Sequence, residues 1–127
     1  MARIFLDANF YIDATKRAKG KWGFLKEHLL FISPLSTHIL FYARKLKVPN
    51  QDVNKLQEEF GIVLLSKDIL DKALEGPTPD LEDNIQLHSA AESECDLFIT
   101  SDKKLLAMRF FGKTQITPPE NLKQGLQ

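Results

Sequence analysis

The sequence predicts an α/β fold, with a central parallel sheet of about four to five strands flanked by helices in three layers. Short apolar runs without polar alternation lie at residues 4–6, 29–32 and 97–99, as is typical of strands buried on both faces of a parallel sheet. Segments with helical spacing of apolar residues separate these runs. Right-handed crossovers then bring the carboxyl ends of all the strands to one edge, where we expect ligands and chemistry to gather.

Size and composition fit one globular domain over residues 1–127, with 43% hydrophobic and 27% charged residues. No apolar run is long enough to span a bilayer and no secretory signal is visible, so we expect a cytoplasmic protein. The single cysteine, Cys95, excludes an intrachain disulfide and suits a reducing compartment. Its place just before an apolar run favours a half-buried packing role over a reactive thiol.

The formal net charge is zero, but the charges are unevenly spread. Residues 1–50 hold nine Lys and Arg against three acids, a net +6, so residues 51–127 carry −6. This asymmetry permits a basic face for a polyanion beside an acidic pocket for cations. Scattered, solvated side chains would give the same count.

The first half of the chain alternates strand and helix. After the strand at 4–6, a helix is expected over 10–17, with a break at 19–21 and an amphipathic segment from Trp22 into the strand at 29–32. Ser33 and Pro34 end that strand. Ser36 or Thr37 is then expected to cap a helix that runs to about Lys47.

The second half continues the alternation. Its predicted helices cover residues 51–60, 69–74, 81–92 and 103–109, the third capped by Asp80. Its predicted strands are a buried strand at 62–65, the strand at 97–99 and a weak edge strand at 115–117. The loop at 76–79, rich in proline, is not a domain boundary, because too little chain follows it for a separate core.

The first strand ends abruptly in the carboxylate of Asp7, followed two residues later by the amide of Asn9. Its position at the carboxyl end of a predicted central strand makes Asp7 a candidate site residue. Alternatively, Asp7 caps the helix that begins near Phe10, a common role for aspartate. The opening stretch alone favours neither role.

Further carboxylates are expected at the same edge. Asp102 follows the strand at 97–99, and Glu82 and Asp83 lie in the first turn of the helix at 81–92. Carboxylates within ~4 Å repel by roughly 4 kcal/mol per pair at an effective dielectric of about 20, so such a cluster takes up protons or holds a cation. An all-oxygen set suits Mg²⁺ or Mn²⁺. Zinc does not fit, because the three histidines and Cys95 lack ligand spacing.

Three segments, at residues 6–9, 81–90 and 98–102, resemble the acidic motifs of PIN-domain ribonucleases, most closely the single-domain toxins of the VapC kind. Their order, separations and placement match, and the resemblance covers essentially the whole chain. It implies a metal-dependent endoribonuclease that hydrolyses RNA phosphodiesters through in-line attack of an activated water. It also implies an antitoxin protein as a partner and a homodimer.

The resemblance also implies residue roles. Asp7 would be the central metal ligand, Asp83 a ligand from the helix, and Asp102 a ligand directly or through water. Asn9 and Thr100 would orient Asp7 and ordered waters. The alternatives are that Asn9 serves only the turn, that Thr100 is an ordinary strand residue, and that Asp83 offsets the helix dipole. Glu82 is expected to be a solvated first-turn acid.

One position departs from the family pattern. The family usually places a glutamate in the helix after the second strand, and the aligned residue here is Ile39, with His38 and Leu40 beside it. Losing that charge should weaken metal binding, particularly of a second ion. A one-metal enzyme with a polar contact from Ser36 or His38 remains open. So does a degenerate, catalytically weak or inactive module that binds RNA or a protein.

Two further points stay open from the sequence. An aspartyl-nucleophile phosphotransferase would use Asp7 covalently, but that chemistry usually needs a second aspartate where Asn9 stands. Aromatic residues that could form dimer or antitoxin interfaces, or belong to the core, are Phe41, Tyr42, Phe110 and Phe111.

Overall fold

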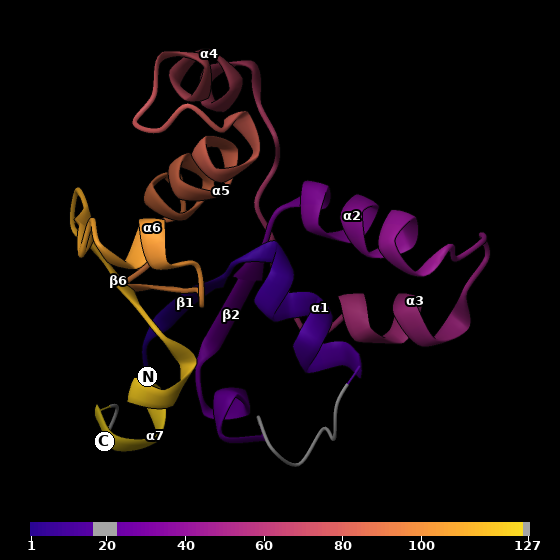
Figure 1. Cartoon of the computed structure of the whole chain (residues 1–127). Coiled ribbons are helices and arrows are strands. Elements are labelled where there is room, and N and C mark those ends of the chain that lie inside the picture. Colours follow the sequence, from indigo (N-terminus) through magenta and orange to yellow (C-terminus); the bar gives the residue numbers. More distant parts are fainter. Residues whose placement is uncertain (17–22, 126–127) are drawn as a thin grey trace.

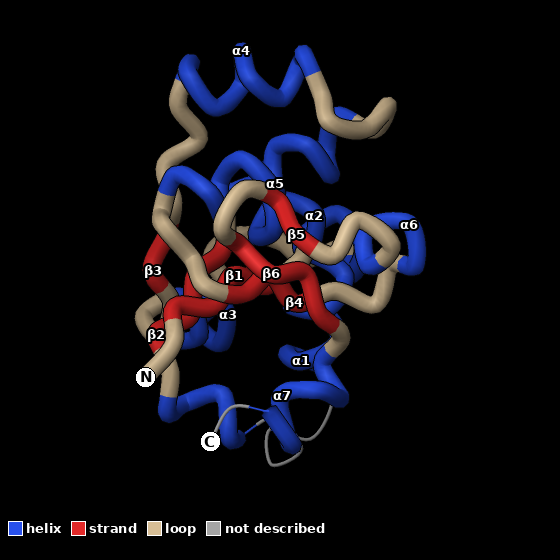
Figure 2. Tube along the Cα trace, turned by 90° about the vertical axis from the view of Figure 1, so that its left-hand side faces the viewer, coloured by secondary structure: helices blue, strands red, loops and turns tan. Residues whose placement is uncertain are grey.

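A six-stranded sheet forms the centre of the computed structural model, which describes residues 1–16 and 23–125 (Figures 1 and 2). Its strands are β1 (Arg3–Leu6), β2 (Leu29–Ile32), β3 (Gly61–Ile62), β4 (Leu97–Ile99), β5 (Phe110–Phe111) and β6 (Thr114–Thr117). Their order across the sheet is β3-β2-β1-β4-β6-β5. Five strands are parallel and only β5 is antiparallel, so the predicted parallel α/β sheet is confirmed.

The strand at 115–117 was wrongly predicted to lie at the edge. β6 pairs in parallel with β4 on one side and antiparallel with β5 on the other. The turn that joins β5 to β6 contains Gly112 with φ +61°, a backbone conformation that favours glycine. A two-residue strand such as β5 is too short to produce a recognisable pattern of apolar residues. The sequence therefore predicted fewer strands than the sheet contains.

Seven α-helices and one 3₁₀-helix surround the sheet in the described part of the chain. They are α1 (Ala8–Lys16), η1 (Gly23–Glu27), α2 (Pro34–Arg44), α3 (Gln51–Gln57), α4 (Lys67–Glu75), α5 (Leu81–Glu92), α6 (Lys103–Leu106) and α7 (Pro119–Gly125). The predicted break at 19–21 and Trp22 lie outside the described residues. No helix among the described residues is long and apolar enough to cross a membrane.

Side chains of the central strand alternate between two hydrophobic cores. Ile4 and Leu6 pack in one cluster with residues of α1, α2 and α3, whereas Phe5 packs in the other with residues of α4, α5 and α6. The ring of Phe5 stacks on that of Phe98 from β4, with centroids 5.6 Å apart. Burial of β1 on both faces explains the uninterrupted apolar run with which the chain begins.

Helix α2 begins earlier than predicted. Ser33, not Ser36 or Thr37, is its N-cap, and the Ser33 hydroxyl accepts a hydrogen bond of 3.1 Å from the backbone N–H of Leu35. Pro34 is the first helical residue, a position where the missing N–H costs nothing. The helix also ends earlier, at Arg44, because Lys45 adopts a left-handed conformation with φ 53°.

The predicted buried strand at 62–65 is wrong beyond its beginning. β3 covers only Gly61 and Ile62, and the side chain of Leu64 is 79% exposed. After Val63 the chain leaves this edge of the sheet for Ser66, which caps α4. The helix predicted over 103–109 likewise ends at Leu106. The apolar residues Leu64 and Leu65 at the edge of the sheet were therefore mistaken for part of a buried strand.

The aromatic residues with open roles divide into two pairs. Phe41 and Phe111 are half-buried and pack against the two core clusters. Tyr42 is 82% exposed and Phe110 is 56% exposed, so these two are available at the surface. Cys95 is buried in the second cluster, which agrees with a packing role.

Candidate active site

Asp7 lies at the point where β1 ends and α1 begins. Its backbone N–H donates to the carbonyl of Ile99 at 3.0 Å, and its carbonyl accepts from the N–H of Tyr11 at 2.9 Å. The backbone of Asp7 thus opens the helix, as the capping alternative expected. Its buried side chain, however, accepts a hydrogen bond of 2.7 Å at Oδ2 from the hydroxyl of Thr100.

Thr100 links the ends of the two central strands. Its buried hydroxyl donates to Asp7 and also accepts a hydrogen bond of 3.0 Å from the backbone N–H of Asp102. Asp102 in turn caps α6, since its Oδ1 accepts from the N–H of Lys104 at 2.8 Å. Asp7 and Asp102 are therefore fixed on adjacent strand ends by one shared side chain.

Asp83 enters the same region from α5. Burial, together with the negative charges of Asp80, Asp7, Asp102 and Glu82, raises its pKa from 3.8 to about 6. Because all four carboxylates affect Asp83, they share one electrostatic environment, and we refer to Asp7, Asp80, Glu82, Asp83 and Asp102 as the carboxylate cluster. No described lysine or arginine lowers the pKa of Asp83, so the repulsion among these carboxylates is not offset.

The pKa of Asp7 is also raised. Burial is the largest cause, opposed by hydrogen bonds from the Thr100 hydroxyl and the Ala8 N–H, and the charges of Asp102 and Asp80 add to the rise. The pKa of Glu82 rises for similar reasons, first burial and then the charges of Asp80 and Asp7. Glu82 is exposed and is therefore a solvated acid, as expected. Its pKa is nevertheless affected by the charges of the cluster.

Asp80 belongs to the cluster although the sequence predicted only a cap. It does cap α5, with Oδ1 accepting from the N–H of Asp83 at 3.0 Å. Its charge also acts on Asp7, Glu82 and Asp83. Its position one turn before Asp83, at the strand-end edge, was the sequence feature that could have revealed it.

Two other expected positions contribute less. Asn9 is exposed in the first turn of α1, and its side chain makes no hydrogen bond to the described residues. Ile39 is half-buried in α2 and brings no polar group toward the cluster. His38 beside it is exposed.

The donor chemistry of the cluster fits a hydrated Mg²⁺ or Mn²⁺ ion. Among the described residues, no three His, Cys, Asp or Glu side chains converge closely enough to enclose a metal ion. Mg²⁺ does not require such a cage, because it keeps several waters and is usually bound through one or two carboxylates together with substrate phosphate. The uncompensated repulsion within the cluster would be relieved by a cation.

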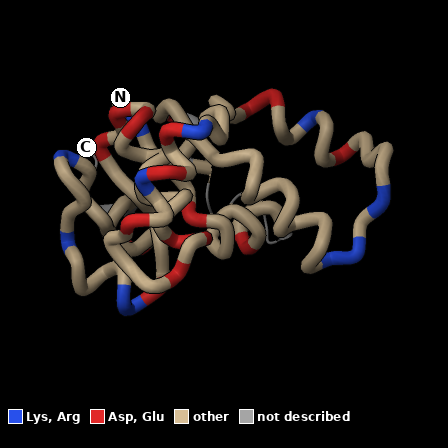
Figure 3. Tube along the Cα trace, turned by 90° about the horizontal axis from the view of Figure 1, so that it is seen from above, with Lys and Arg blue, Asp and Glu red and all other residues tan. Residues whose placement is uncertain are grey.

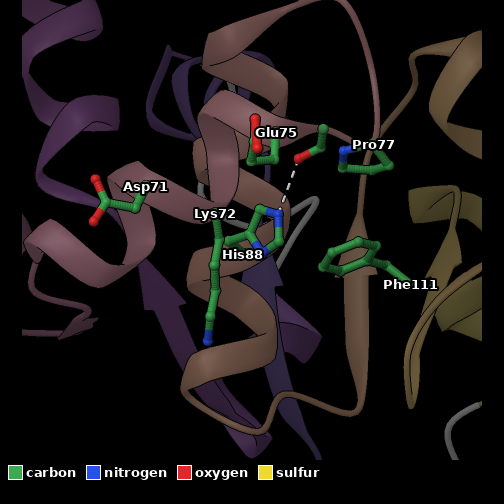
Figure 4. A pocket seen from close by; sticks show the side chains of 7 residues that line it. Asp71, Lys72, Glu75, Pro77, His88 and Phe111 are labelled. Atoms are coloured by element: carbon green, nitrogen blue, oxygen red, sulfur yellow. Dashed lines mark hydrogen bonds between the residues drawn. The ribbon is translucent and has the colours of Figure 1, made fainter.

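An open pocket of about 500 Å³ lies elsewhere, between α4, α5 and β5 (Figure 4). In it, Nε2 of His88 lies 3.0 Å from the carbonyl oxygen of Gly76. The rings of His88 and Phe111 pack edge to face, with centroids 4.9 Å apart. Other lining residues are Asp71, Lys72, Glu75 and Pro77. No member of the carboxylate cluster lines this pocket, so it is separate from the candidate site.

Basic residues gather at the far end of α2. In Figure 3, Lys and Arg mark the right-hand end of the molecule, where α2 passes into the loop before α3, while several Asp and Glu lie nearer the middle. These basic residues are Arg44, Lys45 and Lys47, and no acid occurs between Glu27 and Asp52. Three of the nine basic residues in the first 50 positions therefore lie at this end of the molecule.

No family model matches the chain, and no curated protein sequence does either. Solved structures do match. A chain from a toxin-antitoxin complex of Klebsiella pneumoniae superposes with a TM-score of 0.72 at 21% identity, covering 91% of this chain and 97% of that one. A chain of VapBC2 from Rickettsia felis, bound to a promoter DNA fragment, gives a TM-score of 0.65 at 16% identity.

The protein has the PIN-like fold of VapC toxins. The Rickettsia match covers 91% of this chain and 98% of the other, so the PIN-like fold extends over nearly the full length of both. At this level of identity, the similarity concerns the fold and not the individual side chains. In this chain, the order β3-β2-β1-β4-β6 puts the ends of β1 and β4 side by side, and the carboxylates that follow these strands form the candidate site.

Proposed function

We propose that this PIN-like protein is a metal-dependent endoribonuclease that hydrolyses RNA phosphodiesters at the carboxylate cluster. The observation that carries the proposal is the uncompensated charge at Asp83, whose pKa reaches about 6 beside Asp7 and Asp102. Strongly perturbed carboxyl groups gathered at one sheet edge are a feature of functional sites. A purely structural first-turn acid would not need four further carboxylates around it.

The residues that would hold Mg²⁺ or Mn²⁺ are Asp7, Asp83 and Asp102. When bound, the ion supplies an activated water and charge stabilisation at the phosphate. Thr100 keeps Oδ2 of Asp7 in one orientation through its 2.7 Å hydrogen bond. The same hydroxyl fixes the backbone of Asp102, so one side chain links the residues that carry these two carboxylates. Asn9, exposed beside Asp7, is available to contact substrate or water.

RNA as the substrate class is supported by the location of the basic residues. The first turn of α2 follows β2 at the strand-end edge, and Lys45 and Lys47 follow its other end. Eleven helical residues span roughly 16 Å, the length of a few nucleotides of extended RNA. Lys103 and Lys104, both exposed, lie beside Asp102 at the cluster itself. Phosphates could therefore be contacted at the cluster and along α2.

Partner proteins belong to the same proposal. Both solved relatives come from toxin-antitoxin complexes, which supports an antitoxin as the partner of this chain in the cytoplasm. A homodimer is also proposed, with the exposed aromatic rings of Tyr42 and Phe110 available for an interface. Co-expression with a neighbouring small open reading frame and size measurement of the purified protein would test both.

The deciding experiment measures cleavage of structured and single-stranded RNA with Mg²⁺ or Mn²⁺ by the wild type and by Asp7→Asn. We expect cleavage by the wild type, none after chelation of divalent ions, and a loss of at least 100-fold in the variant. The asparagine can still accept the hydrogen bond from Thr100, so the fold should persist. Equal cleavage by both proteins would exclude a catalytic role for Asp7.

A second function is favoured by one observation. Ile39 brings an apolar side chain where the family pattern leads us to expect a carboxylate. A PIN-like module that binds RNA or a protein without cutting would look like this. Retention of RNA by the purified wild type, with no cleavage under any divalent ion, would support this alternative.

A further inference from the structure

Gln86 is a buried polar side chain that the carboxylate cluster does not explain. It is 0% exposed in α5, and its Nε2 donates a hydrogen bond of 3.3 Å to the hydroxyl oxygen of Ser36, itself fully buried in α2. Its Oε1 has no hydrogen-bond partner among the described residues. Buried polar atoms are nearly always paired, so an unpaired amide oxygen indicates a place for a ligand or an ordered water.

The contact between Ser36 and Gln86 places this oxygen at the strand-end edge. Helices α2 and α5 pack in different core clusters, through Leu40 and Leu87 respectively (Figure 1). Helices on opposite faces of a sheet can touch beyond the strand ends or past an edge strand. Ser36 is in the first turn of α2, directly after β2, so this contact lies beyond the strand ends. Leu35, in the first turn of α2, already packs against the second cluster, which shows that the helix start reaches around the edge.

The same edge carries the carboxylate cluster. β2, which precedes Ser36, pairs with β1, which ends in Asp7. α5 begins at this edge, so Gln86 lies one turn, roughly 4.5 Å, deeper than Asp83 and on the neighbouring stripe of the helix. The contact with Ser36 therefore places the Gln86 amide on the side of α5 that faces the start of α2, one turn from Asp83.

We propose that Gln86 is a positioning residue of the cation site: its Oε1 accepts a hydrogen bond from a water of the hydrated cation held by Asp7 and Asp83. This inference rests on the proposed function. Amide oxygens are ordinary partners of hard cations and their waters. The hydrogen bond from the amide nitrogen to Ser36 fixes the orientation of the amide, and with it the position of Oε1. The pair supplies a neutral polar group where Ile39 leaves α2 without a carboxylate.

The test is a Mn²⁺ titration. Binding is measured by calorimetry and by the loss of the electron paramagnetic resonance signal of free Mn²⁺. We expect Gln86→Leu to bind Mn²⁺ 10- to 100-fold more weakly than the wild type, as is typical for loss of a group that orients a metal site. Ser36→Ala should weaken binding as well, because the amide loses its anchor. The matched control is Ser89→Ala, since Ser89 is equally buried in α5 but bonds only within the helix, to Ile85.

Metal-free melting separates positioning from a structural role. If Gln86 served only the fold through its bond to Ser36, Gln86→Leu and Ser36→Ala would lower the metal-free melting temperature alike and leave the Mn²⁺ affinity unchanged. Gln86→Glu keeps the shape and adds a carboxylate oxygen, so it should bind Mn²⁺ more tightly than the wild type. This variant also carries the test if Gln86→Leu does not fold.

The outcomes distinguish this inference from the proposed function. Unchanged Mn²⁺ affinity in either Gln86→Leu or Gln86→Glu, together with impaired binding by Asp7→Asn, overturns the role of Gln86 and leaves the cation site intact. Absence of Mn²⁺ binding by the wild type overturns both.

Discussion

The hydroxyl of Thr100 donates a hydrogen bond of 2.7 Å to Oδ2 of Asp7 and accepts one of 3.0 Å from the N–H of Asp102. This single buried side chain therefore ties the ends of β1 and β4 together, because it holds the carboxylate of Asp7 and the backbone of Asp102. The arrangement makes Asp7 a side chain held by the sheet, although its backbone opens a helix.

Thr100→Val tests this link, because valine keeps the shape and removes the hydroxyl. We expect the free energy of unfolding to fall by about 1–3 kcal/mol, since the buried Asp7 carboxylate and the Asp102 N–H each lose a partner. Mn²⁺ affinity should fall too, as the pKa of Asp7 rises without the hydrogen bond that lowers it. Urea unfolding and Mn²⁺ titration give the two numbers. Thr100→Ser, which restores the hydroxyl, should recover both; a serine variant as impaired as valine would contradict the hydrogen bond as the cause.

Asp83 gives a pH dependence with a definite sign. Its pKa rises from 3.8 to about 6 on folding, so the folded state binds its proton more tightly. The metal-free protein therefore loses stability as pH rises from about 4 to about 6. Asp83→Asn removes this loss. The melting temperature of the variant relative to the wild type should be unchanged near pH 3.5, increase between pH 4 and 6, and stay higher above pH 7.

Differential scanning fluorimetry across this pH range, in chelator, measures the effect. Asp13→Asn is the control, because Asp13 is an exposed acid of α1 outside the cluster. A pH-independent difference for Asp83→Asn, or an equal profile for Asp13→Asn, would contradict the shared electrostatic environment of the cluster.

Divalent cations should reverse this loss of stability. At pH 7.5, Mg²⁺ or Mn²⁺ at 100 times the dissociation constant stabilises a folded one-site protein by about 2.7 kcal/mol. We expect a corresponding rise in melting temperature for the wild type and a much smaller one for Asp7→Asn. NaCl at the same ionic strength serves as the control. A wild type that responds to Na⁺ and Mg²⁺ alike has no specific cation site.

The sequence predicted the parts of this site that depend on strand ends. Asp7 and Asp102 follow continuous apolar runs, and such runs become the doubly buried strands β1 and β4. The buried alternation of Ile4, Phe5 and Leu6 between two cores follows from strand geometry alone.

Features that depend on tertiary context were missed. Ser33 caps α2 because Pro34 fits the first helical position, whereas the proline looked like a stop. Leu64 and Leu65 form an apolar run in the sequence but leave the sheet at its edge. The contact of Ser36 with Gln86 joins residues 50 apart from opposite faces of the sheet. No periodicity within either helix could have indicated it.

Gly61 tests the packing of the edge strand β3. A Cβ at this position would lie 2.7 Å from two carbons of the Phe31 ring. Cζ of Arg3 lies over the same ring, 4.5 Å from its centroid. Because the ring must shift away from this Cβ, Gly61→Ala should lower the free energy of unfolding by about 1–3 kcal/mol. Gly23→Ala is the control, since a Cβ there meets nothing within 4 Å. Similar urea midpoints for the two variants would show that Phe31 moves aside freely.

The basic end of α2 predicts how RNA binding depends on salt. For single strands, the slope of log affinity against log salt is about −0.7 per phosphate contact, so removing two contacts should reduce its magnitude by about 1.4. The test variant is Lys45→Asn with Lys47→Gln; asparagine tolerates the left-handed backbone of Lys45. Binding is measured by fluorescence anisotropy with a labelled oligonucleotide in the Asp7→Asn background, so that the RNA stays intact.

The control changes Lys67 and Lys72 to glutamine. Both lysines are exposed, but they are paired with Asp71 and Asp68 on α4, at 2.6 and 3.0 Å respectively. Because those lysines are already neutralised locally, their loss should leave the slope nearly unchanged. Equal slopes for the two double variants would mean that RNA does not follow α2, and the lysines beside Asp102 would then be the remaining phosphate contacts to examine.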